Sequence, residues 1–458
     1  MHLHIIGICG TFMGGVARIA KELGHTVSGS DANTYPPMST QLESLGVELF
    51  EGYSAQNIPA TADMVVVGNT ISRGNPELES VLDKGLHYTS GAQWLSENVL
   101  NSRWVLAVSG THGKTTTASM LAWILEDCGY TPGFLIGGVP ANFNESARLG
   151  QSDFFVIEAD EYDTAFCDKR SKFVHYRPKT LVINNLEFDH ADIFDTIEDI
   201  KKQFNHLLKT VPSLGLVVHN ESEEHVKAVL EMGCWSEQQS FGQNQDCSWL
   251  CKPITPDCHQ FEVAHGAQTS QVNWLLIGEH NMLNAVAAIA AAHHVGVQLN
   301  DATSALSRFK SVKRRLETIY DAHGIVVYDD FAHHPTAIQG TLNGLRNKVG
   351  DQHIIAVLEP RSNTMKRGVH KDLLAQALSD ADETYIYADK NVQWDIKQLQ
   401  SQTISDYSSI DSLLNDLLVQ AQEKAKAGTP LHILIMSNGG FDGLHKKLVA
   451  SLKNCKFT

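Results

Sequence analysis

The sequence predicts an α/β fold of three domains, each built around its own largely parallel sheet. Short apolar runs typical of buried strands alternate with helical segments along the chain, and several of them end in glycine-rich or polar loops. The 458 residues are enough for three domains of the usual size, ~150 residues each. Turn signals and the repeating pattern place the domains at residues 1–100, 101–311 and 312–458.

Composition excludes several classes of protein. A hydrophobic content of 43% and a net charge of −16 indicate a soluble chain without a surface for nucleic acid or anionic membranes. No apolar run approaches the ~20 residues of a membrane span, and the N-terminus carries no cationic targeting segment. The eight cysteines are too scattered for a disulfide framework, and Cys247, Cys251, Cys258 and His259 match no familiar zinc spacing. We therefore expect a cytoplasmic protein whose phosphate ligand is a small molecule.

The first domain begins with a βαβ pattern. A strand at residues 2–8 and a glycine loop at 7–15 lead to a helix and a second strand that ends near Asp31. Cys9 stands where the dinucleotide motif G-x-G-x-x-G has its second glycine. On its residues alone, the loop either binds a dinucleotide or supplies glycines for close helix packing. A later strand ends in a polar loop at residues 69–72, where open α/β sheets bind ligands.

The second domain carries the most specific motif of the chain. A strand at residues 104–108 runs into Gly110-Thr111-His112-Gly113-Lys114-Thr115-Thr116-Thr117, and helical composition follows to residue 127. Glycines let main-chain N–H groups surround phosphate oxygens, Lys114 can reach the outer phosphates, and the Thr115 hydroxyl can hold Mg²⁺. The first glycine of the usual phosphate-loop pattern would fall at Val108, so this loop is a shorter form. It predicts binding of a nucleoside triphosphate.

Acidic residues follow two further strands of the second domain. Strand 154–157 ends in Glu158-Ala159-Asp160-Glu161, and strand 180–185 ends in Leu186-Glu187-Phe188-Asp189-His190. Because the carboxyl ends of parallel strands meet at one edge of a sheet, we expect these side chains near the phosphate loop. Mg²⁺ is usually held by one or two carboxylates together with the nucleotide phosphates. Glu158 and His190 are the strongest candidates, and a solvated acid and a structural histidine are the alternatives.

Polar residues also mark the end of the second domain and the strand ends of the third. Residues 278–285 read Gly-Glu-His-Asn-Met-Leu-Asn-Ala and open an alanine-rich helix. In the third domain, a strand at 324–328 ends in Asp329-Asp330-Phe331-Ala332-His333-His334-Pro335. Strands at 353–358 and 431–436 also end in polar loops, which predicts another doubly wound sheet.

These motifs resemble those of the ATP-dependent Mur ligases, which join amino acids or peptides to UDP-linked muramic acid during bacterial wall construction. The matching segments are GTHGKTTT at 110–117, GEHNMLNA at 278–285 and DDFAHHP at 329–335. The resemblance implies a Rossmann-like N-terminal domain for UDP-N-acetylmuramate, a central P-loop ATPase domain and a Rossmann-like C-terminal domain that brings the amine. It also implies ATP and Mg²⁺ as cofactors, and activation of the sugar acid as an acyl phosphate.

The resemblance assigns roles residue by residue. Catalytic roles are implied for Lys114, Glu158, His190 and His333, of which His333 would steer or deprotonate the amine. The implied metal ligands are Thr115, Glu158 and His190. The implied ATP-binding residues are Gly110, Thr111, His112, Gly113, Lys114, Thr115, Thr116, Asn281, Arg315 and Asp330. The implied UDP-sugar residues are Gly7, Cys9, Gly10, Thr11, Phe12, Met13, Asp31, Asn69 and Thr70.

Three segments resemble the branch of the family that attaches a recycled tripeptide, L-alanyl-γ-D-glutamyl-meso-diaminopimelate, to UDP-N-acetylmuramate. They are residues 7–13, 359–365 and 437–441. Peptide contacts would then come from Arg361, Asn363 and Asn438, since an arginine can bind a carboxylate through two hydrogen bonds. A surface salt bridge is the alternative role for Arg361.

Two other functions remain open on the sequence. An L-alanine ligase of peptidoglycan biosynthesis would share every catalytic residue and differ in the amine pocket. A non-catalytic sensor of UDP-sugar and ATP would be expected to lack Lys114, Glu158 or His190, all of which are present. A nicotinamide dehydrogenase would leave the phosphate loop unexplained.

Overall fold

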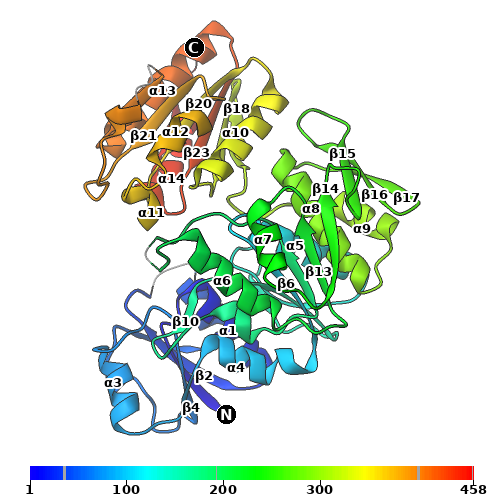
Figure 1. The fold of residues 1–458 in the computed structure, drawn as a ribbon. Coiled ribbons are helices and arrows are strands. Elements are labelled where there is room, and N and C mark those ends of the chain that lie inside the picture. The colour runs from blue at the N-terminus through cyan, green and yellow to red at the C-terminus, as the bar shows by residue number, and fades with distance from the viewer. Residues whose placement is uncertain (35–37, 192, 400–402, 456, 458) are drawn as a thin grey trace.

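The computed structural model describes residues 1–34, 38–191, 193–399, 403–455 and 457, and it contains three large sheets. In Figure 1 the N-terminal sheet lies at the bottom, the central sheet in the middle and the C-terminal sheet at the top. Helices pack beside each sheet, so the predicted α/β class is confirmed. Among the described residues, no helix is long and apolar enough to cross a membrane.

The N-terminal sheet is parallel, in the order β3-β2-β1-β4-β5. Its elements are β1 (His2–Ile6), α1 (Thr11–Glu22), β2 (Thr26–Asp31), α2 (Met38–Ser44), β3 (Glu48–Glu51), β4 (Met64–Val67), α3 (Pro76–Asp83), β5 (Tyr88–Ser90) and α4 (Gly91–Asn98). The first strand ends at Ile6 rather than at the predicted Ile8. Gly7 turns the chain there with φ +82°, and its N–H donates to the Ser30 carbonyl at 2.8 Å.

The central sheet has the order β17-β16-β15-β14-β13-β12-β6-β9-β7-β8. The strands predicted from apolar runs are β6 (Trp104–Ser109), β9 (Phe154–Glu158) and β12 (Thr180–Ile183). Two helices carry motifs, α5 (Lys114–Asp127) and α8 (Glu279–His294). The other strands are β7 (Gly133–Leu135), β8 (Ala147–Arg148), β13 (Leu216–Asn220), β14 (Glu237–Gly242), β15 (Trp249–Pro253), β16 (Gln260–His265) and β17 (Gln268–Asn273). The other helices are α6 (Ile197–Leu208), α7 (Glu224–Glu231) and α9 (Leu299–Leu306).

A small hairpin beside the central sheet consists of β10 (Asp163–Ala165) and β11 (Asp168–Ser171). A short 3-10 helix, η2 (Lys172–His175), follows it directly. The hairpin thus connects the acidic residues after β9 with the start of η2.

The C-terminal sheet has the order β18-β19-β23-β20-β21-β22 and is parallel except for β18 at one edge. Its strands are β18 (Glu317–Ala322), β19 (Ile325–Asp330), β20 (His353–Leu358), β21 (Glu383–Tyr387), β22 (Ile404–Tyr407) and β23 (Leu431–Met436). Its helices are α10 (Pro335–Val349), α11 (Asn363–Lys366), α12 (Lys371–Ala377), α13 (Ile410–Ala427) and α14 (Leu444–Asn454). The predicted doubly wound sheet is confirmed, with the antiparallel β18 as an addition.

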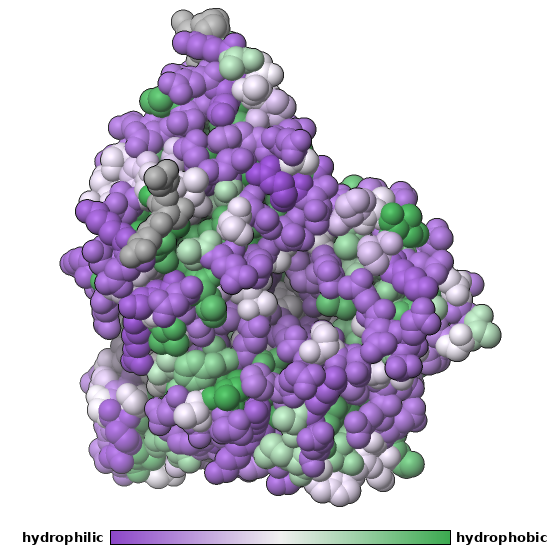
Figure 2. Space-filling model, turned by 45° about the horizontal axis from the view of Figure 1, so that its top comes forward, coloured by the Kyte–Doolittle hydropathy of each residue, from purple (hydrophilic) through white to green (hydrophobic). Residues whose placement is uncertain are grey.

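The first two parts of the chain share one apolar core. Buried side chains under the N-terminal sheet, such as Leu3 and Val16, belong to the same cluster as Leu135 and Phe155 of the central sheet. The C-terminal sheet has one cluster on each face, and one of the two also includes Ile277 of the central domain. The face of the molecule in Figure 2 is mostly hydrophilic, with apolar side chains in small scattered groups.

Candidate active site

The phosphate loop lies between β6 and α5, at the carboxyl edge of the central sheet. Gly110 and Gly113 have φ values of +132° and +78°, which residues with a Cβ rarely adopt. A Cβ on Gly113 would lie 2.4 Å from Oδ1 of Asn284, so the loop packs directly against the motif that opens α8. Because α5 begins at Lys114, its first N–H groups and its dipole favour an anion at the loop.

Lys114 is held inside this loop by oxygen atoms. Its Nζ lies 2.7 Å from the carbonyl oxygen of Gly110, 3.2 Å from Oε2 of Glu161 and 3.5 Å from Oδ1 of Asp160. Burial opposes the charge of the ammonium, but the two carboxylates outweigh burial and raise the pKa of Lys114. The side chain is therefore a cation at neutral pH, already placed beside the anion-binding loop.

Thr115 and Glu158 supply oxygen atoms that suit a magnesium ion. The Thr115 hydroxyl donates to Oε1 of Glu158 at 2.9 Å, and the N–H of Gly137 donates to Oε2 at 2.6 Å. Burial and repulsion from Asp160 raise the pKa of Glu158, so a nearby divalent cation would stabilise its charged form. Hydroxyl and carboxylate oxygens beside a phosphate site are the donor set that Mg²⁺ prefers.

His190 lies on the other side of the acidic group. Its Nε2 lies 3.1 Å from Oε1 of Glu161, and its Nδ1 is hydrogen bonded to the Tyr162 hydroxyl at 2.8 Å. Burial favours the neutral imidazole, but the contact with Glu161 outweighs burial and raises the pKa of His190. A metal ligand must be the neutral imidazole, so a metal at His190 would compete with Glu161 for Nε2.

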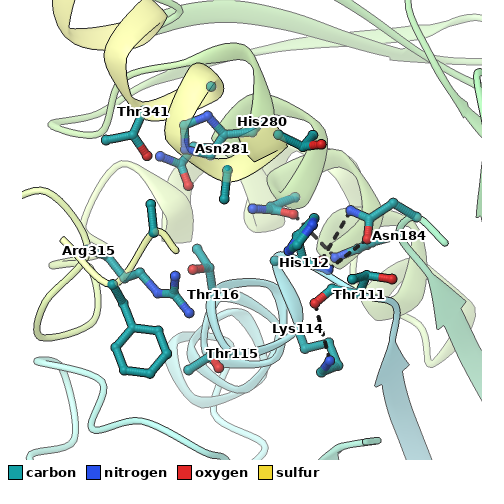
Figure 3. A pocket seen from close by; sticks show the side chains of 18 of the residues that line it. Thr111, His112, Lys114, Thr115, Thr116, Asn184, His280, Asn281, Arg315 and Thr341 are labelled. Atoms are coloured by element: carbon teal, nitrogen blue, oxygen red, sulfur yellow. Dashed lines mark hydrogen bonds between the residues drawn. The ribbon is translucent and has the colours of Figure 1, made fainter. Parts of the chain in front are cut away.

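A cavity of about 650 Å³ lies between the central and C-terminal domains and contains most of the predicted residues. Of the predicted catalytic, ATP-binding and metal-binding residues, all except Gly110 line it. Figure 3 shows Arg315 from the third domain extending toward Thr116 at the start of α5, with His280 and Asn281 on another wall. The fold thus brings together residues separated by more than half of the chain.

Asp330 and Arg315 shape the third-domain wall of this cavity. The Asp330 carboxylate accepts the N–H groups of Leu316 and Ala332, each at 2.7 Å, and burial raises its pKa. The Arg315 guanidinium lies over the ring of Phe331, 5.2 Å from its centroid. Asp330 therefore orders the turns on which Arg315 and Phe331 stand.

His333 is a weak base in this setting. Its Nδ1 lies 3.0 Å from the carbonyl oxygen of Phe331, so a proton on Nδ1 would leave Nε2 as an acceptor. Burial lowers the pKa of His333 to about 4. Such a group accepts a hydrogen bond from an amine more readily than it removes a proton from an ammonium, which favours steering over deprotonation.

A polar cluster joins the central and C-terminal domains beside the cavity. Glu187 Oε2 lies 3.0 Å from Nε2 of His112 and 3.2 Å from Nδ1 of His334, and the Thr336 hydroxyl donates to the same carboxylate at 2.9 Å. Across the described part of the chain, one set of three or more His, Cys, Asp or Glu residues has its ligand atoms within 4.8 Å of one another. It consists of His112, Glu187 and His334. Among the described residues, Cys247, Cys251 and Cys258 belong to no such set.

The N-terminal glycine loop supplies close helix packing, one of the two roles that its sequence left open. A Cβ on Gly14 would lie 2.5 Å from Sδ of Met38, and one on Gly15 would lie 3.1 Å from Cβ of Ala147, so these two glycines permit packing. The N–H of Cys9 donates to Oδ2 of Asp31 at 2.9 Å, so Asp31 holds the loop in place. Residues 7–12 remain at the carboxyl edge of the sheet, the same edge as Asn69 and Thr70 after β4, while the Met13 side chain is buried in the core.

The three peptide-binding candidates lie at different places. Asn438 lines the cavity, and its Oδ1 is buried without a hydrogen-bond partner among the described residues. Arg361 and Asn363 do not line it. Arg361 lies 3.3 Å from Glu359 and packs against Gly439, where a Cβ would come within 2.1 Å of its Nε.

One wall of the cavity was missed by sequence reasoning. It is the face of α10 that carries Thr336, Ala337, Gly340 and Thr341. Residues at a spacing of three to four lie on one face of a helix, so the sequence could have grouped these four but gave no sign that they line a cavity. Tyr162 and Asn184 also line the cavity and carried no separate motif.

Comparisons with known proteins agree with this geometry. The chain matches the descriptions "Mur ligase family, catalytic domain" over residues 2–103, "Mur ligase middle domain" over 108–292 and "Mur ligase, glutamate ligase domain" over 314–439. It is 54% identical over 456 residues to the UDP-N-acetylmuramate–L-alanyl-gamma-D-glutamyl-meso-2,6-diaminoheptandioate ligase of Escherichia coli (strain K12), covering 99% of this chain and 98% of that one. A UDP-N-acetylmuramate–L-alanine ligase of Desulforapulum autotrophicum is 32% identical over 362 residues, 78% of this chain and 77% of that one.

A solved structure extends the likeness to three dimensions. The crystal structure of a murein peptide ligase from Psychrobacter arcticus 273-4 matches with a TM-score of 0.75 and 46% identity, covering 100% of this chain and 99% of that one. The family matches lie in chain order from residue 2 to residue 439. The chain therefore belongs to the Mur ligase family.

Proposed function

We propose that this protein is an ATP-dependent ligase that joins L-alanyl-γ-D-glutamyl-meso-diaminopimelate to UDP-N-acetylmuramate, and so returns a recycled peptide to peptidoglycan synthesis. The observation that carries the proposal is the 54% identity over 99% of the chain to a relative named for that reaction. The relative named for L-alanine is 32% identical over 78% of the chain. Both reactions would use the same phosphate loop and acidic residues, so the two candidate functions differ only in the amine substrate.

The proposed reaction begins at the phosphate loop. The muramate carboxylate oxygen bonds to the γ-phosphorus of ATP, the bond to the β-phosphate oxygen breaks, and ADP leaves. Lys114 would hold the outer phosphates, and Thr115, Glu158 and His190 would hold Mg²⁺. When bound, the ion would neutralise phosphate charge during transfer. The other proposed ATP contacts are Gly110, Thr111, His112, Gly113, Thr116, Asn281, Arg315 and Asp330.

The second step uses the C-terminal domain. The amine nitrogen of the tripeptide attacks the acyl phosphate carbon, inorganic phosphate leaves, and the new amide gives up a proton. His333 would accept a hydrogen bond from the amine and direct it to the carbon. Holding amine and acyl phosphate together contributes an entropic advantage that can reach ~7 to 11 kcal/mol in well-oriented intramolecular reactions. Asn438 is the best placed of the peptide-binding candidates, because its buried Oδ1 faces no protein donor among the described residues.

The remaining assignments follow from the same proposal. Residues 1–100 would bind the UDP-sugar through the loop from Gly7 to Met13 with Asp31, Asn69 and Thr70. Residues 101–311 would bind ATP, and residues 312–458 would bind the peptide. The free thiols of all eight cysteines support a reducing compartment, which we propose is the cytoplasm.

ADP release separates the candidate functions. The protein is supplied with UDP-N-acetylmuramate, ATP and Mg²⁺, together with either the tripeptide or free L-alanine, and products are identified by mass spectrometry. We expect turnover with the tripeptide and at most a small fraction of that rate with L-alanine. Turnover with L-alanine alone would make the chain the biosynthetic ligase. Binding of UDP-sugar and ATP without turnover of either amine would favour the sensor.

A further inference from the structure

Lys172 is a buried cation that none of the roles above uses. It begins η2, directly after the β10–β11 hairpin, and only 7% of the residue is exposed. None of the described residues accepts a hydrogen bond from its Nζ or comes within ion-pair distance of it. A largely buried ammonium without a protein acceptor is costly to keep charged. An anionic ligand would supply the missing acceptor.

The carboxylates around Lys172 are already engaged elsewhere. Asp163 pairs with Lys169 at 2.6 Å, and Glu161 pairs with Lys114 and His190. Asp160 lies 3.5 Å from Nζ of Lys114. Burial lowers the pKa of Lys172, although these acids act in the opposite direction. Among the described residues, Lys172 is thus the lysine of this group that forms no ion pair.

The position of Lys172 connects two parts of the proposed site. Its Nζ lies 5.0 Å from the ring centroid of Phe12, which follows the glycine loop of the first domain, and 5.6 Å from that of Tyr162. The Tyr162 hydroxyl contacts His190, which contacts Glu161, the partner of Lys114. Lys172 therefore lies between the first-domain loop and the chain of contacts that leads to Lys114.

We propose that Lys172 binds the lactyl carboxylate of the UDP-linked sugar and holds it between Phe12 and the Lys114 side of the site. This inference rests on the proposed function and names one contact of its sugar substrate. The Phe12 and Tyr162 rings near Nζ favour the charged ammonium through cation–π attraction. A charged donor of this kind gives the enzyme a means to prefer an acidic sugar over a neutral one.

The test compares two nucleotide sugars that differ in this acid. Binding of UDP-N-acetylmuramate and of UDP-N-acetylglucosamine, which lacks the lactyl group, is measured by calorimetry for the wild type, Lys172→Met, Lys172→Arg and Lys169→Met. Lys169 is the matched control, because it lies three residues earlier in β11 with a side chain that is 70% exposed. Circular dichroism verifies that each variant is folded, and ADP release gives KM and kcat.

We expect Lys172→Met to weaken binding of the acidic sugar about 10- to 100-fold, as for loss of a charged hydrogen bond. Binding of the neutral sugar and the KM for ATP should stay within about twofold. Lys172→Arg should retain part of the preference, and Lys169→Met all of it. If Lys172→Met weakened binding of both nucleotide sugars equally, Lys172 would contact the diphosphate and the assignment would be overturned. An unchanged preference of Lys172→Met for the acidic sugar would overturn it as well. If the wild type bound and turned over neither sugar, the proposed function itself would fail.

Discussion

Glu158 and Glu161 lie three residues apart, yet their surroundings shift the pKa values of the two carboxyl groups in opposite directions. Glu161 contacts Lys114 and His190, and these cations overcome burial and lower its pKa to about 2. Burial raises the pKa of Glu158, and repulsion from Asp160 adds to this effect. Among the described residues, its hydrogen-bond donors are only a hydroxyl and an N–H. Glu161 is therefore satisfied by the protein, whereas Glu158 gains most from an added cation. This difference supports Glu158 with Thr115 as the centre of the proposed magnesium site.

Replacing Thr115 tests that site with a matched pair of variants. Thr115→Val keeps the shape of the side chain but removes the hydroxyl, and we expect the Mg²⁺ concentration for half-maximal ADP release to rise about tenfold or more, equivalent to ~1.4 kcal/mol of ion binding. Thr115→Ser retains the oxygen and should stay within about threefold of the wild type. An unchanged Mg²⁺ requirement in Thr115→Val would exclude the hydroxyl as a ligand.

At the residue scale, sequence reasoning located the cavity but not every contact within it. The phosphate loop, Glu158, His190, Arg315 and His333 carry motif signals, and the fold brings them together. Lys172 has no such signal, because its proposed role depends on the contact with Phe12, which lies in another domain. The same holds for Arg361, whose position away from the cavity depends on its packing against Gly439.

At the scale of elements, buried parallel strands were predictable and exposed edge strands were not. The strands at residues 353–358 and 431–436 were predicted with their observed ends, because each is a continuous apolar run buried on both faces. In β17 and β18 most side chains are not fully buried, so the apolar signal is weak. The packing of α5 against α8 could not be predicted either, since it requires two helices that lie far apart in the chain.

The contact between α5 and α8 can be tested at Gly113. A Cβ there would lie 2.4 Å from Oδ1 of Asn284, and the backbone φ of +78° would strain a residue that has a Cβ. Gly129, after the end of α5, has a similar φ of +83° but nothing within 4 Å of a Cβ. We expect Gly129→Ala to cost about 1 kcal/mol of stability from backbone strain alone. Gly113→Ala should cost roughly 1 to 3 kcal/mol more, because overpacking adds to the strain.

Urea unfolding and ATP binding of the two variants give the comparison. Gly113→Ala should lose ATP affinity by more than tenfold, since the loop must shift to make room for the methyl group. Gly129→Ala should bind ATP as the wild type does. Equal stability losses in the two variants would mean that Asn284 moves aside without cost and that α8 does not fix the loop.

At the scale of the molecule, the domains are joined in two different ways. The first two share an extensive apolar core. The third meets the central domain mainly through polar contacts, which include the cluster of His112, Glu187, His334 and Thr336 and the bond from Thr364 to Asp189, together with the apolar side chain of Ile277. Polar contacts exchange with water at lower cost than an apolar core, so the third domain is the part best suited to open and close over the cavity. No local pattern could predict this cluster, because its members lie on segments far apart in the chain that the fold brings together.

That cluster should make closure sensitive to acid. His334 is 5% exposed, and burial together with His112 lowers its pKa to about 3, from ~6.5 in an exposed histidine. Between these values the open or unfolded chain binds a proton that the closed form excludes. The stability of the contact is therefore complete above pH ~6.5 and falls as the pH decreases, by up to ~1.4 kcal/mol per unit. Glu187, with a pKa of about 2, contributes stability that is lost only below pH ~4.5, so it does not account for a change at pH 5.

The measurement is the free energy of unfolding at pH 7 and pH 5 for the wild type and His334→Gln. The wild type should lose roughly 2 kcal/mol more than the variant over this interval, since only the wild type carries the excluded proton. Fluorescence transfer between dyes on the central and C-terminal domains should report opening of the wild type in the same range. Parallel pH dependences in the two proteins would show that His334 is already charged in the closed form, and would remove acid sensitivity from the contact between the domains.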